Sequence, residues 1–141
     1  MKCISIRTPW WSWILQGGKD IENRSWSTAY RGPLLIHASL FSNVDEIREN
    51  AKLAKRIAKF DRQRRTNLPQ PFDFDAVKPL LGHVVGLVTL ADCVTESESP
   101  WYGGEYGFVL RNPVVLKPFP VKGSLRIFNV DVTEKDLKKR R

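Results

Sequence analysis

The densest cluster of reactive side-chain types lies in residues 18–26, with the sequence G-K-D-I-E-N-R-S-W. Lys19, Glu22 and Arg24 supply an ammonium, a carboxylate and a guanidinium, which could form a charge network. Within such a network Lys19 could act as a general base, and Glu22 could position it or transfer a proton. The same residues could equally form a salt-bridged surface loop, because structural ion networks are common. We therefore treat Lys19, Glu22 and Arg24 as the catalytic candidates if the protein is an enzyme.

Aromatic residues are the second feature, with five Trp, three Tyr and seven Phe among 141 residues. We expect at least one of Trp10, Trp11 and Trp13 to pack in the core, whereas an exposed Trp could stack on a base. In W-Y-G-G-E-Y-G at 101–107, glycines beside aromatics would let a flat ligand approach the backbone, although this loop could instead plug a barrel end. The candidates for contact with a ligand or nucleic acid are Arg7, Trp10, Lys19, Glu22, Asn23, Arg24, Trp26, His37, Ser39, Trp101, Tyr102 and Tyr106.

The chain is basic, with 23 Lys and Arg against 15 Asp and Glu and a net charge of +8. A polyanion is the simplest partner for such a charge, and nucleic acid is the commonest polyanion in a cell. A protein that is merely basic would have the same composition. The candidate electrostatic surface is the basic stretch around a predicted helix and comprises Lys52, Lys55, Arg56, Lys59, Arg62, Arg64 and Arg65.

The histidines do not suggest a metal site. His37 lies in L-L-I-H-A, where we expect a hydrogen-bonded strand histidine at a pocket wall. His83 is the only other histidine, and no cysteine or carboxylate lies at ligand spacing, so we predict no metal. P-loop, G-x-G-x-x-G, G-x-S-x-G and H-E-x-x-H motifs are also absent from the sequence. This weakens assignments as a nucleotide triphosphatase, dehydrogenase, serine hydrolase or zinc protease, and we predict no cofactor.

The sequence carries no signal for a particular cellular compartment, so the cytoplasm is the default prediction. Cys3 and Cys93 both lie in apolar runs, as small core residues would, and they form no disulfide framework. The first residues lack a continuous apolar signal segment, and no apolar run approaches about 18 residues. We therefore predict a cytoplasmic protein without a membrane partner. The sequence does not indicate an oligomeric state.

The reactive clusters must be positioned by short elements. Helix signals are clearest at 10–16, which follows Thr8-Pro9 and precedes Gly17-Gly18, and after Asn43, which has Glu46 at capping-box spacing. Lys19 to Trp26 lacks a helical period and is predicted to be a loop or an irregular extended segment. Residues 68–79 hold three prolines and are predicted to be mostly loop. The predicted strands are 3–7, 34–38, 82–94 bent at Gly86, 106–111, 114–121 at an edge, and 123–132.

This pattern predicts the α+β class, with a small β-barrel and two early helices. Hydrophobic residues make up 42% of the chain, which is enough for one core. We predict a single domain over residues 1–132, followed by a basic tail at 133–141 that frays.

The motif G-x-K-x-x-E-x-R is present as G-G-K-D-I-E-N-R at 17–24, within S-I-R-T-P-W-W-S-W-I-L-Q-G-G-K-D-I-E-N-R-S-W. This segment resembles the ASCH domain family, whose members have a PUA-like barrel. Further matching segments follow in order: Y-R-G-P-L-L-I-H-A-S, G-H-V-V-G-L-V-T-L-A-D-C-V, S-P-W-Y-G-G-E-Y-G-F-V-L-R-N-P and P-V-K-G-S-L. The resemblance covers roughly residues 1–130.

The resemblance implies a PUA-like barrel with a cleft lined by the Lys-Glu-Arg motif, in a family associated with RNA or other nucleic-acid binding. The same family also includes a ribonuclease and a small amidohydrolase that acts on an acylated cytidine. The amidohydrolase uses a Lys, a Thr three positions later and a later Glu. Lys19 matches that Lys, and Glu22 occupies the position of the Thr. The later Glu has three candidates in this chain: Glu96, Glu98 and Glu105.

Three functions therefore remain open. The first is a module that binds RNA, another nucleic acid or a nucleoside, with a base in the Lys-Glu-Arg cleft and the backbone on the basic face. The second is an enzyme, either a metal-independent ribonuclease or an amidohydrolase on modified nucleosides. The third is a protein-interaction adaptor whose charge is incidental. We favour the first, because charge, aromatic content and family resemblance agree on it.

Overall fold

The computed structural model describes residues 1–61 and 72–140. Within these residues a six-stranded sheet, in the order β2-β5-β4-β3-β1-β6, forms the framework of the molecule. Neighbouring strands are antiparallel except β1 and β3. The strands are β1 (Lys2–Ile6), β2 (Ile21–Arg24), β3 (Gly32–Ala38), β4 (His83–Val94), β5 (Tyr106–Pro120) and β6 (Ile127–Asn129). The helices are α1 (Trp10–Gln16), α2 (Val44–Ala58), α3 (Phe74–Val77) and the 3₁₀ helix η1 (Lys78–Leu80).

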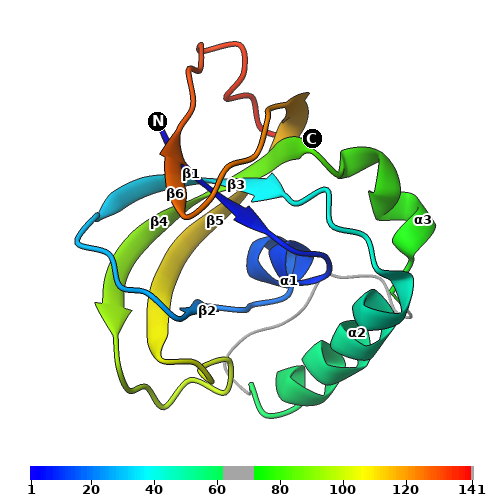
Figure 1. Cartoon of the computed structure of the whole chain (residues 1–141), viewed down its shortest axis with the longest axis vertical. Helices are drawn as coiled ribbons and strands as arrows, with labels where there is room; N and C mark the ends of the chain where they lie inside the picture. The colour runs from blue at the N-terminus through cyan, green and yellow to red at the C-terminus, as the bar shows by residue number, and fades with distance from the viewer. Residues whose placement is uncertain (62–71, 141) are drawn as a thin grey trace.

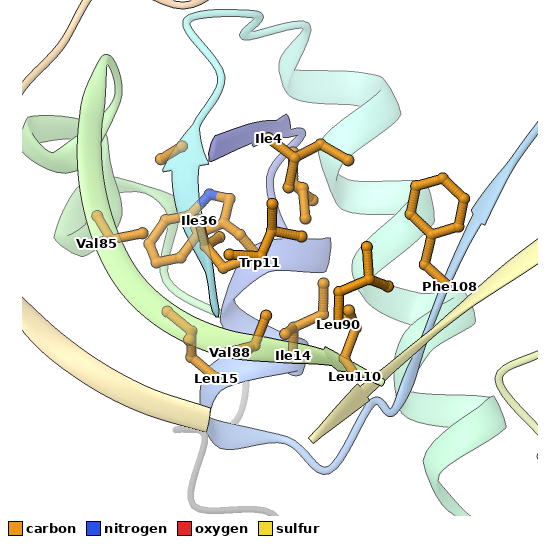
Figure 2. Packing of buried hydrophobic residues seen from close by; sticks show 13 residues of the cluster. Ile4, Trp11, Ile14, Leu15, Ile36, Val85, Val88, Leu90, Phe108 and Leu110 are labelled. Carbon is orange, nitrogen blue, oxygen red and sulfur yellow. The ribbon is translucent and has the colours of Figure 1, made fainter. Parts of the chain in front are cut away.

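The sheet curls around α1, and α2 and α3 lie outside it (Figure 1). This is the α+β, barrel-like architecture that the sequence predicts. Trp11, Ile14 and Leu15 of α1 project into the curled sheet and pack against residues such as Ile36 and Val88 (Figure 2). A short helix wrapped by strands is stable here because most of its surface is removed from water.

Gly86 bends β4, as the sequence predicts. The pairing of β4 with β5 shifts register between Val84 and Gly86. A Cβ atom at Gly86 would lie 2.4 Å from the Leu15 side chain and 2.9 Å from the carbonyl oxygen of Val114. Only glycine therefore lets α1 approach the sheet this closely.

Two predicted strands, 106–111 and 114–121, are one continuous strand, β5. Asn112, with φ of +54°, and Pro113 lie between them. The pairing with β4 shifts register opposite these residues, so that they form a bulge rather than a break. The strand predicted at 123–132 is shorter in the structure. Only Ile127–Asn129 forms a strand, β6, which pairs with β1.

The sequence predicts a loop or an irregular extended segment at residues 21–24, but these residues form the regular strand β2. Their backbone pairs with residues 106–109 of β5. Ile21, which is buried beside Trp13, inserts into the core and fixes this pairing. Because side chains alternate along a strand, Glu22 and Arg24 lie on one face and Asn23 on the other. The strand therefore positions the candidate site.

The helix starts differ in part from the expectation. At α2 the Oδ1 atom of Asn43 accepts a hydrogen bond from the Glu46 amide at 3.0 Å, as predicted. The Glu46 carboxylate does not complete a capping box, because it pairs with Arg7 at 3.1 Å. At α1 the Thr8 side chain caps no amide; its hydroxyl accepts from the Trp11 indole at 3.0 Å. The proline-rich stretch, for which mostly loop is expected, holds α3 and η1, with Asp73 as N-cap.

The predicted fraying of the C-terminal tail is wrong for residues 133–140. Leu116 of β5 forms an isolated bridge with Lys139, and the Arg140 amide donates to the Val115 carbonyl at 3.0 Å. Leu137 packs against the second buried cluster, which includes Cys3. The edge half of β5 exposes backbone groups that need partners, and the tail supplies them. In the part of the chain that the structure describes, no helix is long and apolar enough to cross a membrane.

Candidate ligand-binding cleft

A three-residue charge network lies at the junction of α1 and β2. The Lys19 Nζ atom donates to Glu22 Oε1 at 3.1 Å and to the carbonyl oxygen of Ile21. Arg24 donates to Glu22 Oε2 from Nε at 3.0 Å, and its Nη2 atom lies 2.9 Å from the same oxygen. The carboxylate is thus held between an ammonium and a guanidinium, and the charge network inferred from the sequence is present.

Burial gives this network its electrostatic character. Lys19 is 5% exposed and Glu22 is 8% exposed. Burial alone would raise the pKa of Glu22, but the charges and hydrogen bonds of Lys19 and Arg24 together hold it below its ordinary value. Arg24 also donates to the Ser5 carbonyl of β1 at 2.9 Å, which ties the edge strand β2 to β1 on the other side of the curled sheet.

A cavity of about 310 Å³ opens over the Lys19 end of the network. Its walls come from α1, β2, Leu53 and Ile57 of α2, and the loop at 99–104. Nζ of Lys19 lies 5.7 Å from the centroid of the Trp10 ring, so that an aromatic face flanks the ammonium. The lining residues are Trp10, Lys19, Glu22, Asn23, Leu53, Ile57, Pro100, Trp101, Tyr102 and Gly103.

The loop at 99–104 is fixed by Asn23 and Asp20. Asn23 donates from Nδ2 to the Trp101 carbonyl at 2.9 Å and accepts from the Gly103 amide at 3.0 Å. The Ser99 hydroxyl donates to Asp20 at 2.6 Å. The Asn23 amide is therefore occupied within the protein, and its role here is to hold the cavity wall.

Trp101 is part of that wall. It is 2% exposed, its ring lies 5.6 Å from the Trp13 ring, and its indole donates to Asp61 at 2.9 Å. At Gly107 of β5 the close approach is made by the protein itself, because a Cβ there would lie 2.8 Å from the Tyr102 ring; Gly103, which lines the cavity, has nothing within 4 Å of a Cβ position. Trp10 and Tyr102 remain as the half-buried aromatic faces of the cavity.

The remaining candidates do not line this cavity. His37 is buried, with Nδ1 2.7 Å from the Ser5 hydroxyl and Nε2 2.8 Å from the Val121 carbonyl. Burial lowers the pKa of His37 despite its hydrogen bonds to the backbone. Arg7 pairs with Glu46 and lies 3.9 Å from the Phe41 ring centroid.

The last three candidates for ligand contact also lie outside the cavity lining. Ser39 accepts from the Phe41 amide at 3.2 Å. Tyr106 is half-buried and packs against the main core. Trp26 also packs there, and its ring meets Phe108 edge-on at 5.1 Å. Trp26 is nevertheless linked to the network, because the Arg24 guanidinium lies 6.0 Å from its centroid.

The basic surface is partly described. Lys52, Lys55, Arg56 and Lys59 are exposed on and just after α2, and Lys52 lies 3.5 Å from Glu49. Lys52 and Lys55 also line a groove of about 620 Å³ between α2 and residues 72–78. Arg62, Arg64 and Arg65 lie outside the described residues.

The three candidates for a later carboxylate, Glu96, Glu98 and Glu105, are exposed and do not line the cavity. Among residues 1–61 and 72–140, no three His, Cys, Asp or Glu side chains gather as a metal site requires.

Sequence reasoning missed three contributors. Leu53 and Ile57 of α2 form part of the cavity wall, and their helical spacing could have indicated a shared face. Arg126, whose guanidinium lies 5.1 Å from the Trp26 ring centroid, had no signal in its local sequence.

The curled sheet, the plugging helix and the Lys-Glu-Arg network define a small α+β protein with a cleft beside its first helix. The ASCH domain family model matches residues 4–108, so the chain belongs to the ASCH domain family. It is 31% identical over 148 aligned positions to Activating signal cointegrator 1 of Homo sapiens and 29% identical over 143 to that of Mus musculus. Each match covers 92% of this chain and 22% of the relative, so the chain spans about a fifth of their length.

Proposed function

We propose that this ASCH domain binds RNA or a nucleotide, with a base in the cleft above Lys19. The observation that carries the proposal is the buried Lys19 ammonium, fixed by Glu22 at the base of a 310 Å³ cavity with aromatic walls. Small-ligand sites in proteins start at about 300 Å³, so the cavity suits one planar base. Cytoplasmic location remains a prediction of the sequence.

The cleft offers both polar and stacking contacts to such a base. Of the three N–H groups of Lys19, one donates to Glu22 and one to Ile21. The third can donate to a base carbonyl or a phosphate oxygen. Trp10 and Tyr102 provide half-buried aromatic faces, and base–aromatic stacking contributes about 1–3 kcal/mol per base.

The charge of the surrounding surface supports a polyanionic ligand. Ile57 and Leu53 of α2 line the cleft, while Lys52 and Lys55 of the same helix, and Lys59 at its end, are exposed. A strand that places one base in the cleft would therefore have basic side chains near its backbone. Binding should weaken steeply with salt, because phosphate contacts release condensed counterions.

Retardation of labelled single-stranded RNA in EDTA tests the proposal, with cleavage read from the same samples. Lys19→Met should weaken binding about 10- to 100-fold, because it removes a charge-assisted hydrogen bond in a buried site. Lys117→Met is the matched control: this exposed lysine lies eight residues along β5 from Val109, about 25 Å away along the strand. Equal binding by the two variants would contradict the proposal.

The same assay addresses the enzyme alternative. The Lys19 Nζ atom already donates to the Glu22 carboxylate and to the Ile21 carbonyl, so it is held in place as a hydrogen-bond donor. Both oxygens of Glu22 already accept from cations, and its lowered pKa makes it a weak base. We therefore favour binding over catalysis. RNA cleavage that Lys19→Met abolishes would reverse this preference.

An adaptor function is the second candidate, and the name Activating signal cointegrator 1 of the relatives favours it. A protein partner held by apolar contacts should remain bound at high salt, whereas a nucleic acid held by phosphate contacts should dissociate. If the protein does not retard RNA even at low salt, the adaptor function becomes the favoured one.

A further inference from the structure

A second cationic site lies beyond the cleft, at Trp26 and Arg126. The Arg126 guanidinium lies 5.1 Å from the Trp26 ring centroid, and the Trp26 ring is itself braced edge-on by Phe108 at 5.1 Å. The backbone of Arg126 has φ of +57°, a conformation that non-glycine residues adopt rarely. The surrounding loop therefore holds Arg126 in a defined place.

That loop, residues 121–126, is anchored to the core at its start. The buried ring of His37 contacts the Val121 carbonyl at 2.8 Å, and the Val121 amide donates to the Gly82 carbonyl at 3.2 Å. A Cβ atom at Gly123 would lie 2.9 Å from the His37 ring and 3.0 Å from the Ser5 hydroxyl. The loop thus lies directly against buried residues, which fixes the side chains that it presents.

The loop presents two cations to solvent. Lys122 and Arg126 are exposed, and neither makes an ion pair with any residue in the described parts of the chain. Leu125, between them, is 89% exposed. A guanidinium that is positioned by an indole rather than by a carboxylate keeps its planar set of N–H donors for a phosphate group.

The second site is connected to the cleft through Arg24. This guanidinium binds Glu22 on the cleft side and lies 6.0 Å from the Trp26 ring on the other. Trp26 lies four positions after Glu22 in the chain, a span of at most about 13 Å. At the stacked spacing of a nucleic-acid strand, this span corresponds to about four nucleotides.

We propose that Arg126 and Lys122 bind the backbone phosphates of a single strand whose base occupies the Lys19 cleft. This inference rests on the proposed function. It gives the bound strand a path across the surface, which runs from the cleft past Arg24 to Trp26. It also predicts that an oligonucleotide binds more tightly than a mononucleotide.

The test compares the Arg126→Ala/Lys122→Ala double variant with wild-type protein on a ten-nucleotide single-stranded RNA and on a mononucleotide. For the oligonucleotide, the slope of log affinity against log salt should fall by about 0.7 for each phosphate that the variant no longer neutralises. Mononucleotide affinity should stay unchanged. The matched control is Lys117→Ala/Lys138→Ala, which removes the same charge from two exposed residues near the tail.

The outcomes separate the two proposals. If wild-type protein binds the RNA and both double variants show the same salt slope, the second site is wrong and the cleft proposal stands. If wild-type protein binds neither ligand, the cleft proposal itself fails. If a polyglutamate peptide displaces the RNA as effectively as RNA of equal charge, the site is not a phosphate site.

Discussion

Arg24 and Glu22 lie two residues apart on one face of β2, and two nitrogens of the guanidinium lie within 3.0 Å of one carboxylate oxygen. The other oxygen accepts from Lys19. One carboxylate therefore fixes two cations, one at the cleft and one toward Trp26. This relationship makes Glu22 the structural centre of the candidate site and leads to the first prediction.

Glu22→Gln should destabilise the fold by about 3 kcal/mol, because it leaves two cations together, one of them buried, without their counter-charge. The free energy of unfolding from urea titration measures this loss. Glu96→Gln is the matched control, because Glu96 is exposed and makes no ion pair in the described residues. Equal stability of the two variants would show that the network contributes nothing.

The Glu22 contribution should also depend on pH. Its folded-state pKa lies below the ordinary value of 4.5, so the folded state binds fewer protons than the unfolded state at acid pH. The stabilisation is then fully present above pH 4.5 and is lost as the pH falls through the folded-state pKa. The difference in unfolding free energy between wild type and Glu22→Gln should shrink on acidification; a constant difference would contradict this assignment.

His37 should make stability depend on pH in a higher range. Burial lowers its pKa below 6.5, so protonation favours the unfolded chain once the pH falls below that value. Wild-type stability should decline as the pH falls from about 7.5 through 6.5 and toward the lowered folded-state pKa, and His37→Gln should remove part of that decline. His83→Gln provides the control; a pH profile that His83→Gln flattens more than His37→Gln would refute the prediction.

Gly86→Ala should destabilise the protein by about 1–3 kcal/mol, since the new methyl group would overlap Leu15 and the Val114 carbonyl. Gly103→Ala is the control, because nothing lies within 4 Å of a Cβ at that position. Thermal unfolding of both variants gives the comparison. A similar small change in both would mean that α1 can move away from β4 at little cost.

The sequence predicted what depends on local chemistry. Asn43, with Glu46 at capping-box spacing, indicated the start of α2, and Gly86 indicated the bend in β4. The strand at Ile21–Arg24 could not be recognised, because four residues show no period and their pairing with β5 is formed across some 85 positions of chain. The ordered structure of the C-terminal tail could not be predicted for the same reason, because the tail pairs with β5, whose residues lie elsewhere in the sequence.

The parts of the candidate site that are close in sequence were predicted, and the parts that depend on distant segments were not. Lys19, Glu22 and Arg24 are close in sequence, so their types and spacing alone suggested a network. Asn23 and Trp101 were expected to contact ligand; both line the cavity, and their hydrogen bonds, which no local pattern indicated, also hold its wall in place. The position of Arg126 beside Trp26 depends on how β6 returns to β1, which no local pattern records.

Photo-crosslinking of a 4-thiouridine-containing single-stranded RNA, with the modified residues mapped by mass spectrometry, tests the central claim most directly. Because the base should lie between aromatic walls above Lys19, crosslinks are expected at Trp10 or Tyr102, and Lys19→Met should reduce them while Lys117→Met does not. Crosslinks confined to the exposed lysines of α2 or to the tail, with none at Trp10, Tyr102 or other residues of the cleft lining, would contradict a base-binding cleft.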